Sequence, residues 1–386
     1  MFRTHLQELA GKSLTRRLRA LGSGTGPTVL FEGRRVILLS SNDYLGLATH
    51  PDVVQAAVRA TELYGAGAGA SRLVCGTLPP HEHLESALAA FKQTESALLF
   101  GSGYLANLGT IPCMVGQGGL ILADRLCHAS LIDGCRLSGA DFRVFRHGDS
   151  AHVESLLKRR RSTRPTLIVT DGLFSMDGDL APLPELVSLA AQHNATLYVD
   201  DAHGTGIMGS SGRGTIEHFG LERKVPFHMG TLGKALGSSG AYVVGPRDII
   251  DYLINTSRPF IFTTAPPPGT AAAADAALGV VQREPERRAR LWANRRRLFD
   301  GLRQLGFRMT PTVSPILPIL IGDAAKTLAF AERLLAHGVY APAIRPPTVP
   351  DETSRIRVTV TSEHSADQID EALRAFDLAG RATGLL

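Results

Sequence analysis

The residues best suited to chemistry stand at the ends of two expected strands. Asp200 is the last residue of the apolar run 196–200, and His203 comes three residues later. Lys234 follows the run 227–231. In open α/β sheets, ligands bind beyond the carboxyl ends of strands. A carboxylate and a nearby imidazole at such an end can therefore address two points on one small molecule. A lysine in a turn of small residues can form a Schiff base with a carbonyl cofactor when its pKa is lowered.

This combination is typical of a site for pyridoxal phosphate (PLP). PLP is an electron sink that is held as an imine on a lysine, with an acidic partner at its pyridine nitrogen. A carboxylate beside that nitrogen keeps it protonated, so that the ring can absorb the carbanion formed at the α carbon of an amino acid. The phosphate needs backbone N–H donors, which a Gly-rich turn opening a helix supplies best. The turn 101–104, after an expected strand at 96–100, fits that role.

The elements that must position these residues can be read from the pattern of apolar runs. From about residue 45 to 280, β-rich runs alternate with helical stretches, which predicts an α/β fold with a mostly parallel sheet covered by helices on both faces. The expected strands are 96–100, 120–123, 166–170, 196–200, 227–231 and 241–244, and the expected helices between them are 80–92, 151–158 and 183–193.

The length predicts more than one domain, because 386 residues exceed one hydrophobic core of ordinary size. We expect an N-terminal arm over residues 1–45, a large PLP-binding domain over 46–285 and a smaller C-terminal α/β domain over 286–386. The arm is expected to be helical to about residue 22, because its leucines fall roughly on one face. A long arginine-rich helix should open the small domain, followed by strands near 316–321 and 355–360.

Composition argues against several classes of protein. The net charge is +5, but the densest basic run, 158–161, has no interleaved aromatic residues, so we expect no nucleic-acid partner. The mild basicity suits an acidic substrate such as a nucleotide-bearing thioester. No apolar run reaches the roughly 18 residues that span a bilayer, and no signal peptide is evident. The four cysteines show no CxxC pairing and indicate reduced thiols, so we expect a cytoplasmic protein without a membrane partner.

Two further patterns are weaker than they first look. Gly65, Gly67 and Gly69 suggest a dinucleotide site, but they follow a helical stretch rather than a strand. His81 and His83 lack the HExxH spacing of a zinc site, and we expect no metal.

The chain resembles the α-oxoamine synthases of the fold-type I PLP superfamily over nearly its whole length. The resemblance rests on several motifs along the chain, and together they are specific. They are Ser40–Leu47 (SSNDYLGL), Gly67–Gly76 (GAGASRLVCG), His128-Ala129-Ser130, Asp171–Asp179 (DGLFSMDGD), Asp200–Gly206 (DDAHGTG), Thr231–Lys234 and Ile344–Pro350 (IRPPTVP).

The resemblance implies roles around the cofactor ring. Lys234 would form the Schiff base and act as acid and base at the α carbon, and Asp200 would pair with the pyridine nitrogen. His203 and Ser175 would hydrogen-bond the phenolic oxygen, and His128 would stack on the ring face. His128, Asp200, His203 and Lys234 are thus the expected catalytic residues.

Further positions would hold the phosphate. Thr231 would bind it together with the turn at Gly103 and Tyr104. Thr263 or Thr264 from a partner subunit could join them, which together with the N-terminal arm implies a homodimer.

The remaining positions would hold the substrates. Asn42 and Arg357 would bind the amino-acid carboxylate, with Arg357 as a bidentate clamp. Arg16 and Thr348 would lie along the path of the acyl donor, although Arg17 and Arg19 compete with Arg16 for that position.

The implied activity is that of a PLP-dependent acyltransferase in biotin biosynthesis. Alanine and a pimeloyl thioester of coenzyme A or acyl carrier protein would give 8-amino-7-oxononanoate, carbon dioxide and the free thiol carrier. Gly204-Thr205-Gly206 favours alanine, because members that use glycine tend to carry Ala-Val-Gly there. The alternatives are glycine C-acetyltransferase, 5-aminolevulinate synthase and a serine palmitoyltransferase-like enzyme. A catalytically inactive scaffold of the same fold is disfavoured because Lys234 is present.

Overall fold

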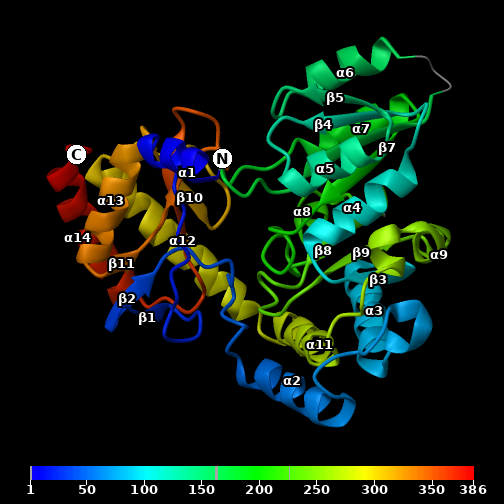
Figure 1. Cartoon of the computed structure of the whole chain (residues 1–386), viewed down its shortest axis with the longest axis horizontal. Helices are drawn as coiled ribbons and strands as arrows, with labels where there is room; N and C mark the ends of the chain where they lie inside the picture. Colours follow the sequence, from blue (N-terminus) through cyan, green and yellow to red (C-terminus); the bar gives the residue numbers. More distant parts are fainter. Residues whose placement is uncertain (1, 161–163, 226) are drawn as a thin grey trace. The chain divides into compact units, whose positions relative to one another are not determined.

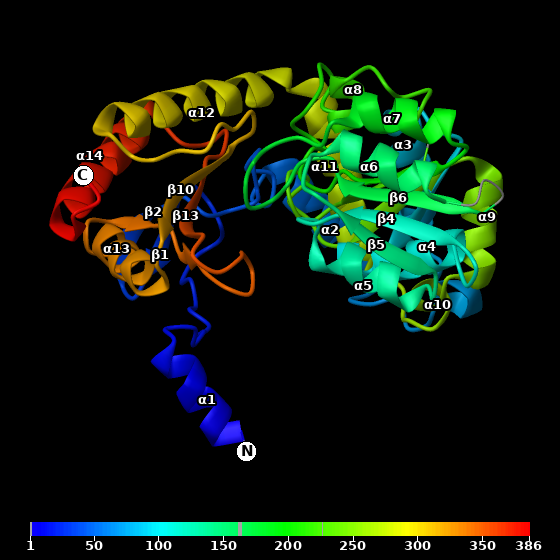
Figure 2. The ribbon, with the colours of Figure 1, turned by 90° about the horizontal axis from the view of Figure 1, so that it is seen from above.

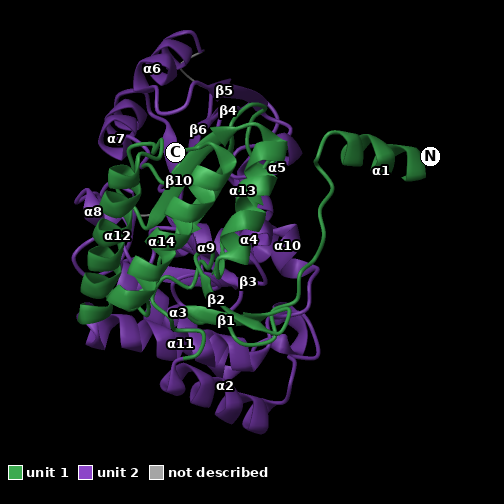
Figure 3. Ribbon diagram, turned by 90° about the vertical axis from the view of Figure 1, so that its left-hand side faces the viewer, with its two compact units in different colours: residues 1–49, 175–179, 286–386 green, residues 50–174, 180–285 purple. Residues whose placement is uncertain are grey.

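The computed structural model describes residues 2–160, 164–225 and 227–386, and the chain divides into two compact units (Figure 3). Unit 1 comprises the N-terminal stretch through Thr49, the short segment Ser175–Asp179, and Glu286–Leu386. Unit 2 comprises His50–Phe174 and Leu180–Pro285.

Unit 2 is built on a sheet of seven strands among its described residues. The strands are β3 (Ser96–Phe100), β4 (Leu120–Asp124), β5 (Asp141–Phe145), β6 (Thr166–Asp171), β7 (Thr196–Asp200), β8 (His228–Thr231) and β9 (Ala241–Gly245). Their order is β3-β9-β8-β7-β6-β4-β5, and β4 to β8 pair in parallel while β9 is antiparallel to both its neighbours. The prediction of a mostly parallel sheet is confirmed, whereas the strand β5 had not been predicted.

Side chains of the central strands point alternately into two apolar layers. Leu167 and Val169 of β6 join one cluster, and Ile168 between them joins the other. The first layer is covered by α4 (Gly103–Met114), α5 (Ala129–Leu137), α9 (Arg247–Thr256) and α10 (Arg258–Ile261). The second is covered by α6 (Ser150–Lys158), α7 (Leu183–Gln192) and α8 (Thr215–His218), on the opposite side of the sheet (Figure 2). Near-continuous apolar strands are expected when both faces are covered.

The described part of unit 2 also contains four further helical elements. They are α2 (Pro51–Tyr64), the π-helical turn η1 (Arg72–Gly76), α3 (Pro79–Lys92) and α11 (Pro268–Arg283). Both α2 and α3 pack against α11, and Figure 1 shows α2 alongside it. Arg161 of the basic run 158–161 lies outside the described residues.

Unit 1 contains two small sheets and several helices. The first sheet joins β1 (Thr28–Phe31), β2 (Arg34–Leu38) and β11 (Val339–Tyr340), and the second joins β10 (Ile316–Gly322), β13 (Ser354–Thr359) and β12 (Ala343–Ile344). Besides the N-terminal helix, its helices are α12 (Pro285–Leu305), α13 (Ala324–Ala336) and α14 (Ala366–Thr383). The rings of Phe307, Phe330 and Phe376 pack together.

The N-terminal helix is shorter than predicted. Helix α1 spans Phe2–Gly11, and residues 14–21 form neither helix nor strand. Ser13 has a φ of 56°, a left-handed conformation that ends a right-handed helix. Leu18 is fully exposed and no described residue of α1 is buried. The leucines of this segment therefore have no apolar surface to pack against that would stabilise a longer helix.

A buried histidine joins β2 of unit 1 to the turn after β13. One ring nitrogen of His364, Nδ1, accepts a hydrogen bond from the Thr361 amide at 3.0 Å, and Nε2 lies 3.1 Å from the Leu38 carbonyl oxygen. Burial lowers the pKa of His364 to about 4, against the effect of these backbone hydrogen bonds. The folded protein therefore keeps this ring neutral down to that pH.

We expect this histidine to make stability depend on pH. Between pH 6.5 and about 4, the unfolded chain binds a proton at His364 that the folded chain does not, so stability falls as the pH falls through this window. Urea unfolding of the wild type and His364→Gln should show that the difference in unfolding free energy shrinks by about 2 kcal/mol from pH 7 to pH 5. Asp43, whose pKa burial raises to about 6, has the opposite pH dependence but is common to both proteins. An equal difference at both pH values would contradict the prediction.

Candidate active site

The carboxyl ends of three neighbouring strands meet at one edge of the large sheet. In the register of β6, β7 and β8, Asp171 lies opposite Asp200, and Asp200 lies opposite Met229. Thr231 ends β8 two residues further on. This edge is where an open α/β sheet binds its ligand.

Asp200 is buried and held by two donors. Its Oδ2 accepts from Asn107 Nδ2 of α4 at 2.8 Å, and its Oδ1 accepts from the Ala202 amide at 3.0 Å. Asn107 is itself fixed, because its Oδ1 accepts from the Tyr198 hydroxyl at 3.0 Å and its Nδ2 also donates to Ser130 Oγ at 2.9 Å. The carboxylate therefore has one orientation.

His128 belongs to the same network. Its Nδ1 lies 2.8 Å from Ser130 Oγ, and its backbone amide donates to Asp171 Oδ2 at 2.9 Å. Burial lowers the pKa of His128, an effect that Asp200 opposes and Lys234 reinforces, so the imidazole is neutral at neutral pH. Burial, with the neighbouring Asp200 carboxylate, raises the pKa of Asp171 well above its ordinary value.

Lys234 and Thr231 lie beside the start of α4. Lys234 Nζ donates to Thr231 Oγ1 at 3.2 Å, and Thr231 Oγ1 donates to the Ala202 carbonyl at 3.3 Å. A Cβ on Gly103 would lie 2.7 Å from Thr231 Cγ2, so only glycine lets the first turn of α4 approach so closely. The amine, the hydroxyl and the first amides of a helix, which favour an anion, are thus gathered in one place.

Two other predicted residues flank this group. His203 is buried in the turn that follows β7. The Tyr104 hydroxyl donates a short hydrogen bond to Asp133 of α5. The residues of unit 2 fit PLP, since they offer an amine, a buried carboxylate, an imidazole and a helix N-terminus with a hydroxyl beside it.

In unit 1, Arg357 organises a second group. Its Nη2 donates to Asn42 Oδ1 at 3.1 Å and to the Tyr44 hydroxyl at 3.4 Å, and its Nε donates a short hydrogen bond to the Ser175 carbonyl. The sequence assigned Asn42 and Arg357 to one group and Ser175 to the phenolic oxygen of the cofactor. In the structure, Asn42 and the backbone carbonyl of Ser175 both contact Arg357. Tyr44, which is fully buried, was not given a role there.

Arg16 contacts a further predicted residue of unit 1. Its Nη2 donates to Thr348 Oγ1 at 3.3 Å and to the Pro346 carbonyl at 3.1 Å. Arg19, one of its competitors for that position, lies over the ring of Phe31 instead, with its guanidinium carbon 5.8 Å from the ring centroid. Of the three arginines, Arg16 is the one for which the structure gives a contact with Thr348.

Sequence reasoning gave no role to Asn107 or Lys92, and it included Asp171 in a motif without giving it a role. Asn107 is a buried amide in a largely apolar helix, and a polar position there could have indicated a structural role. Lys92 ends α3 and is buried against Asp201. Nothing in the local sequence distinguishes it from a lysine at a solvated helix end.

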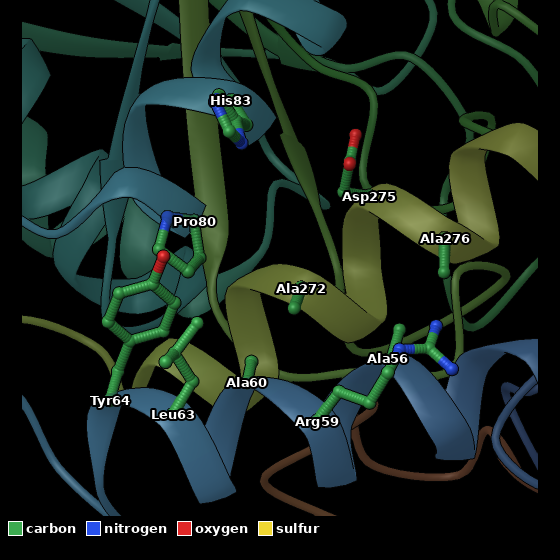
Figure 4. A pocket seen from close by; sticks show the side chains of 10 residues that line it. All are labelled: Ala56, Arg59, Ala60, Leu63, Tyr64, Pro80, His83, Ala272, Asp275 and Ala276. Atoms are coloured by element: carbon green, nitrogen blue, oxygen red, sulfur yellow. The ribbon is translucent and has the colours of Figure 1, made fainter.

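A surface pocket of about 380 Å³ lies elsewhere in unit 2, between α2, α3 and α11 (Figure 4). Four alanines, Leu63 and Pro80 line it together with Arg59, Tyr64, His83 and Asp275, and none of the predicted site residues is among them. Among the described residues, no group of His, Cys, Asp and Glu side chains has the arrangement of a metal site. No helix in the described part of the chain has the length and apolar character to span a membrane.

Comparison with known proteins agrees with this geometry. The model of the family "Aminotransferase class I and II" matches residues 34–376. Among curated relatives, the 8-amino-7-oxononanoate synthase of Symbiobacterium thermophilum is 47% identical over 99% of this chain and 97% of its own length. That of Geobacter sulfurreducens is 49% identical over 99% and 98%.

Two solved structures are similar to this chain over 90% or more of its length. A serine palmitoyltransferase from S. paucimobilis with a bound PLP–myriocin aldimine has a TM-score of 0.96 at 34% identity and covers 100% of this chain and 98% of its own. The 8-amino-7-oxononanoate synthase from Francisella tularensis has a TM-score of 0.77 at 28% identity, covering 90% and 98%. The expected fold-type I architecture and the expected PLP cofactor are thereby confirmed. The chain belongs to the aminotransferase class I and II family.

Proposed function

We propose that this enzyme condenses L-alanine with a pimeloyl thioester, releasing carbon dioxide and the free thiol carrier and forming 8-amino-7-oxononanoate for biotin biosynthesis. The observation that carries the proposal is the near full-length identity of 47–49% to relatives with that name. The gathering of Lys234, Asp200 and His128 within unit 2 supplies the residues that PLP chemistry needs.

The cofactor supplies an electron sink for the pair of electrons left at the α carbon of the amino acid. Lys234 would hold it covalently and then move the proton at that carbon. Asp200 would keep the pyridine nitrogen protonated, and its burial and its two fixed donors support a permanently oriented carboxylate. Neutral His128 would stack on the ring, while His203 and Ser175 would bind the phenolic oxygen. Thr231, with the amides at Gly103 and Tyr104, would bind the phosphate.

Arg357 would bind the carboxylate of alanine. Asn42 and Tyr44 fix its guanidinium, so little conformational freedom is lost when a carboxylate binds. Because Nη2 and Nε already donate to Asn42, Tyr44 and the Ser175 carbonyl, a bidentate clamp would require one of these contacts to be released. Arg16 and Thr348, which contact each other, would line the path of the acyl donor, and a cation there suits the phosphates of coenzyme A or of a phosphopantetheine carrier.

The organisation of the protein belongs to the same proposal. We propose a large PLP domain over residues 46–285, a small domain over 286–386 and an arm over 1–45, in a cytoplasmic homodimer. Acyl carrier protein and coenzyme A are both candidate carriers. The N-terminal arm would complete a neighbouring subunit's site, which is consistent with the absence of buried residues among those described in α1.

Replacing the Schiff-base lysine gives the simplest test of the cofactor chemistry. Lys234→Ala should lose the visible absorption that borohydride bleaches in the parent protein, because the amine that forms the imine is gone. The rate should fall by about 10²–10⁴-fold or more, as expected when an acid–base group is lost. Lys158→Ala, at an exposed lysine of α6, is the control and should keep both properties. A reducible chromophore that survives in Lys234→Ala would assign the imine to another residue.

The choice of substrates distinguishes the proposed reaction from the reactions of related enzymes. The high TM-score to a serine palmitoyltransferase makes that activity the second candidate. Thiol release should be measured with pimeloyl, acetyl, succinyl and palmitoyl thioesters against alanine, glycine and serine. We expect the highest kcat/KM for alanine with the pimeloyl donor, and only about 10–200-fold discrimination between amino acids that differ by one methyl group. Preference for serine with palmitoyl, or for glycine with acetyl or succinyl thioester, would contradict the proposal and leave the PLP chemistry intact.

A further inference from the structure

Two carboxylates adjoin at the end of β7, and their side chains have different partners. Asp200 faces α4, where Asn107 donates to it. The next residue, Asp201, is fully buried and accepts from the backbone amide of Thr215, at the start of α8, at 3.0 Å and from the Thr215 hydroxyl at 2.7 Å. These are the opposite faces of the sheet, as the alternation of side chains along a strand requires.

The charge of Asp201 is balanced by a buried lysine. Lys92 Nζ, on a side chain that is 1% exposed, donates to Asp201 Oδ2 at 3.2 Å, to Thr205 Oγ1 at 2.9 Å and to the Arg213 carbonyl at 2.5 Å. An ammonium has three donors, and all three are used. The lysine therefore joins the end of α3 to both ends of the segment 205–213.

Burial acts to lower the pKa of Lys92, but Tyr242 and Asp201 outweigh it and raise the pKa above its ordinary value. The amine is therefore charged at neutral pH. The Tyr242 hydroxyl also lies 2.9 Å from Thr205 Oγ1, and its ring centroid lies 5.7 Å from Lys92 Nζ, so β9 belongs to the same network.

Two glycines show how closely the chain follows this pair. A Cβ on Gly204 would lie 2.1 Å from Asp201 Oδ1, and a Cβ on Gly214 would lie 1.6 Å from Oδ2. Gly214 also has a φ of 114°, which only glycine adopts readily. The segment that starts after His203 and returns at Thr215 is thus wrapped directly around the Asp201 carboxylate.

We propose that the buried Lys92–Asp201 pair is a positioning device that fixes the backbone from Asp200 to Thr205 and thereby sets where Asp200 and His203 meet the cofactor ring. Lys92 acts through Asp201, Thr205 and the Arg213 carbonyl. The inference rests on the cofactor roles proposed above for Asp200 and His203.

If the pair only stabilised the fold, its replacement would change the thermal unfolding of the protein but not its affinity for PLP or its visible spectrum. Buried ion pairs can often be replaced by apolar residues with little loss of stability, whereas removal of one partner leaves a buried charge. The double variant Lys92→Met/Asp201→Asn removes both charges and should fold, but it would no longer hold the segment 205–213 through the ammonium. The double variant therefore separates an effect on the position of this segment from an effect on the stability of the fold.

The test uses the PLP-loaded protein and its apo form. Lys92→Met, the double variant and the control Lys158→Met should be compared by thermal unfolding of the apo protein, by PLP titration and by the pH midpoint of the visible absorption band. We expect Lys92→Met and the double variant to shift the midpoint by about half a pH unit or more and to weaken PLP binding about tenfold, because misplaced contacts around the ring lose strength steeply. Lys158→Met should match the wild type in all three.

Unchanged PLP affinity and an unchanged midpoint in a folded Lys92→Met protein would overturn the proposal. If that variant does not fold, the double variant decides by the same readings. Failure of both to fold would also overturn it, since the pair would then serve the fold as a whole. The spectrum needs neither alanine nor an acyl donor, so a protein that rejects both substrates would refute the proposed function and leave this inference standing.

Discussion

The site depends on the pair of adjacent carboxylates at the end of β7. Along a strand, neighbouring side chains point to opposite faces, so Asp200 and Asp201 cannot serve the same partner. Each is buried, and a buried carboxylate is tolerated only when donors surround it. Asn107 and the Ala202 amide satisfy the first, and Lys92 and Thr215 satisfy the second. In the proposed function, Asp200 would orient the cofactor, while Asp201 would hold the chain in place.

The parallel sheet turns this local arrangement into a site. Because β6, β7 and β8 run in the same direction, Asp171, Asp200 and Thr231 end at one edge, and α4 starts nearby with Gly103 against Thr231. Unit 1 has a polar group of its own around Arg357, to which the segment Ser175–Asp179 is bound. Arg355 reinforces that attachment through Asp177 at 2.5 Å and the Met176 carbonyl at 3.1 Å.

Much of this architecture could be predicted from the sequence, because apolar runs and turn residues are local signals. Six of the seven strands described in the large sheet were expected, but β5 was missed since its sequence, DFRVF, carries charge on a half-exposed edge. The helix expected over residues 1–22 ends at Gly11. Leucine spacing could not predict this end, because it does not show whether the helix has a surface to pack on. Asn107 and Lys92 were missed for another reason. Their partners lie 93 and 109 residues away in the chain, and only the folded sheet brings them together.

The central claim is that Asp200, and not Asp201, keeps the pyridine nitrogen of the cofactor protonated. The most direct measurement is the nitrogen-15 NMR shift of labelled PLP bound to the wild type, Asp200→Asn and Asp201→Asn at neutral pH. We predict a protonated ring nitrogen in the wild type and in Asp201→Asn, and an unprotonated nitrogen in Asp200→Asn. A ring nitrogen that stays protonated in Asp200→Asn would contradict the account.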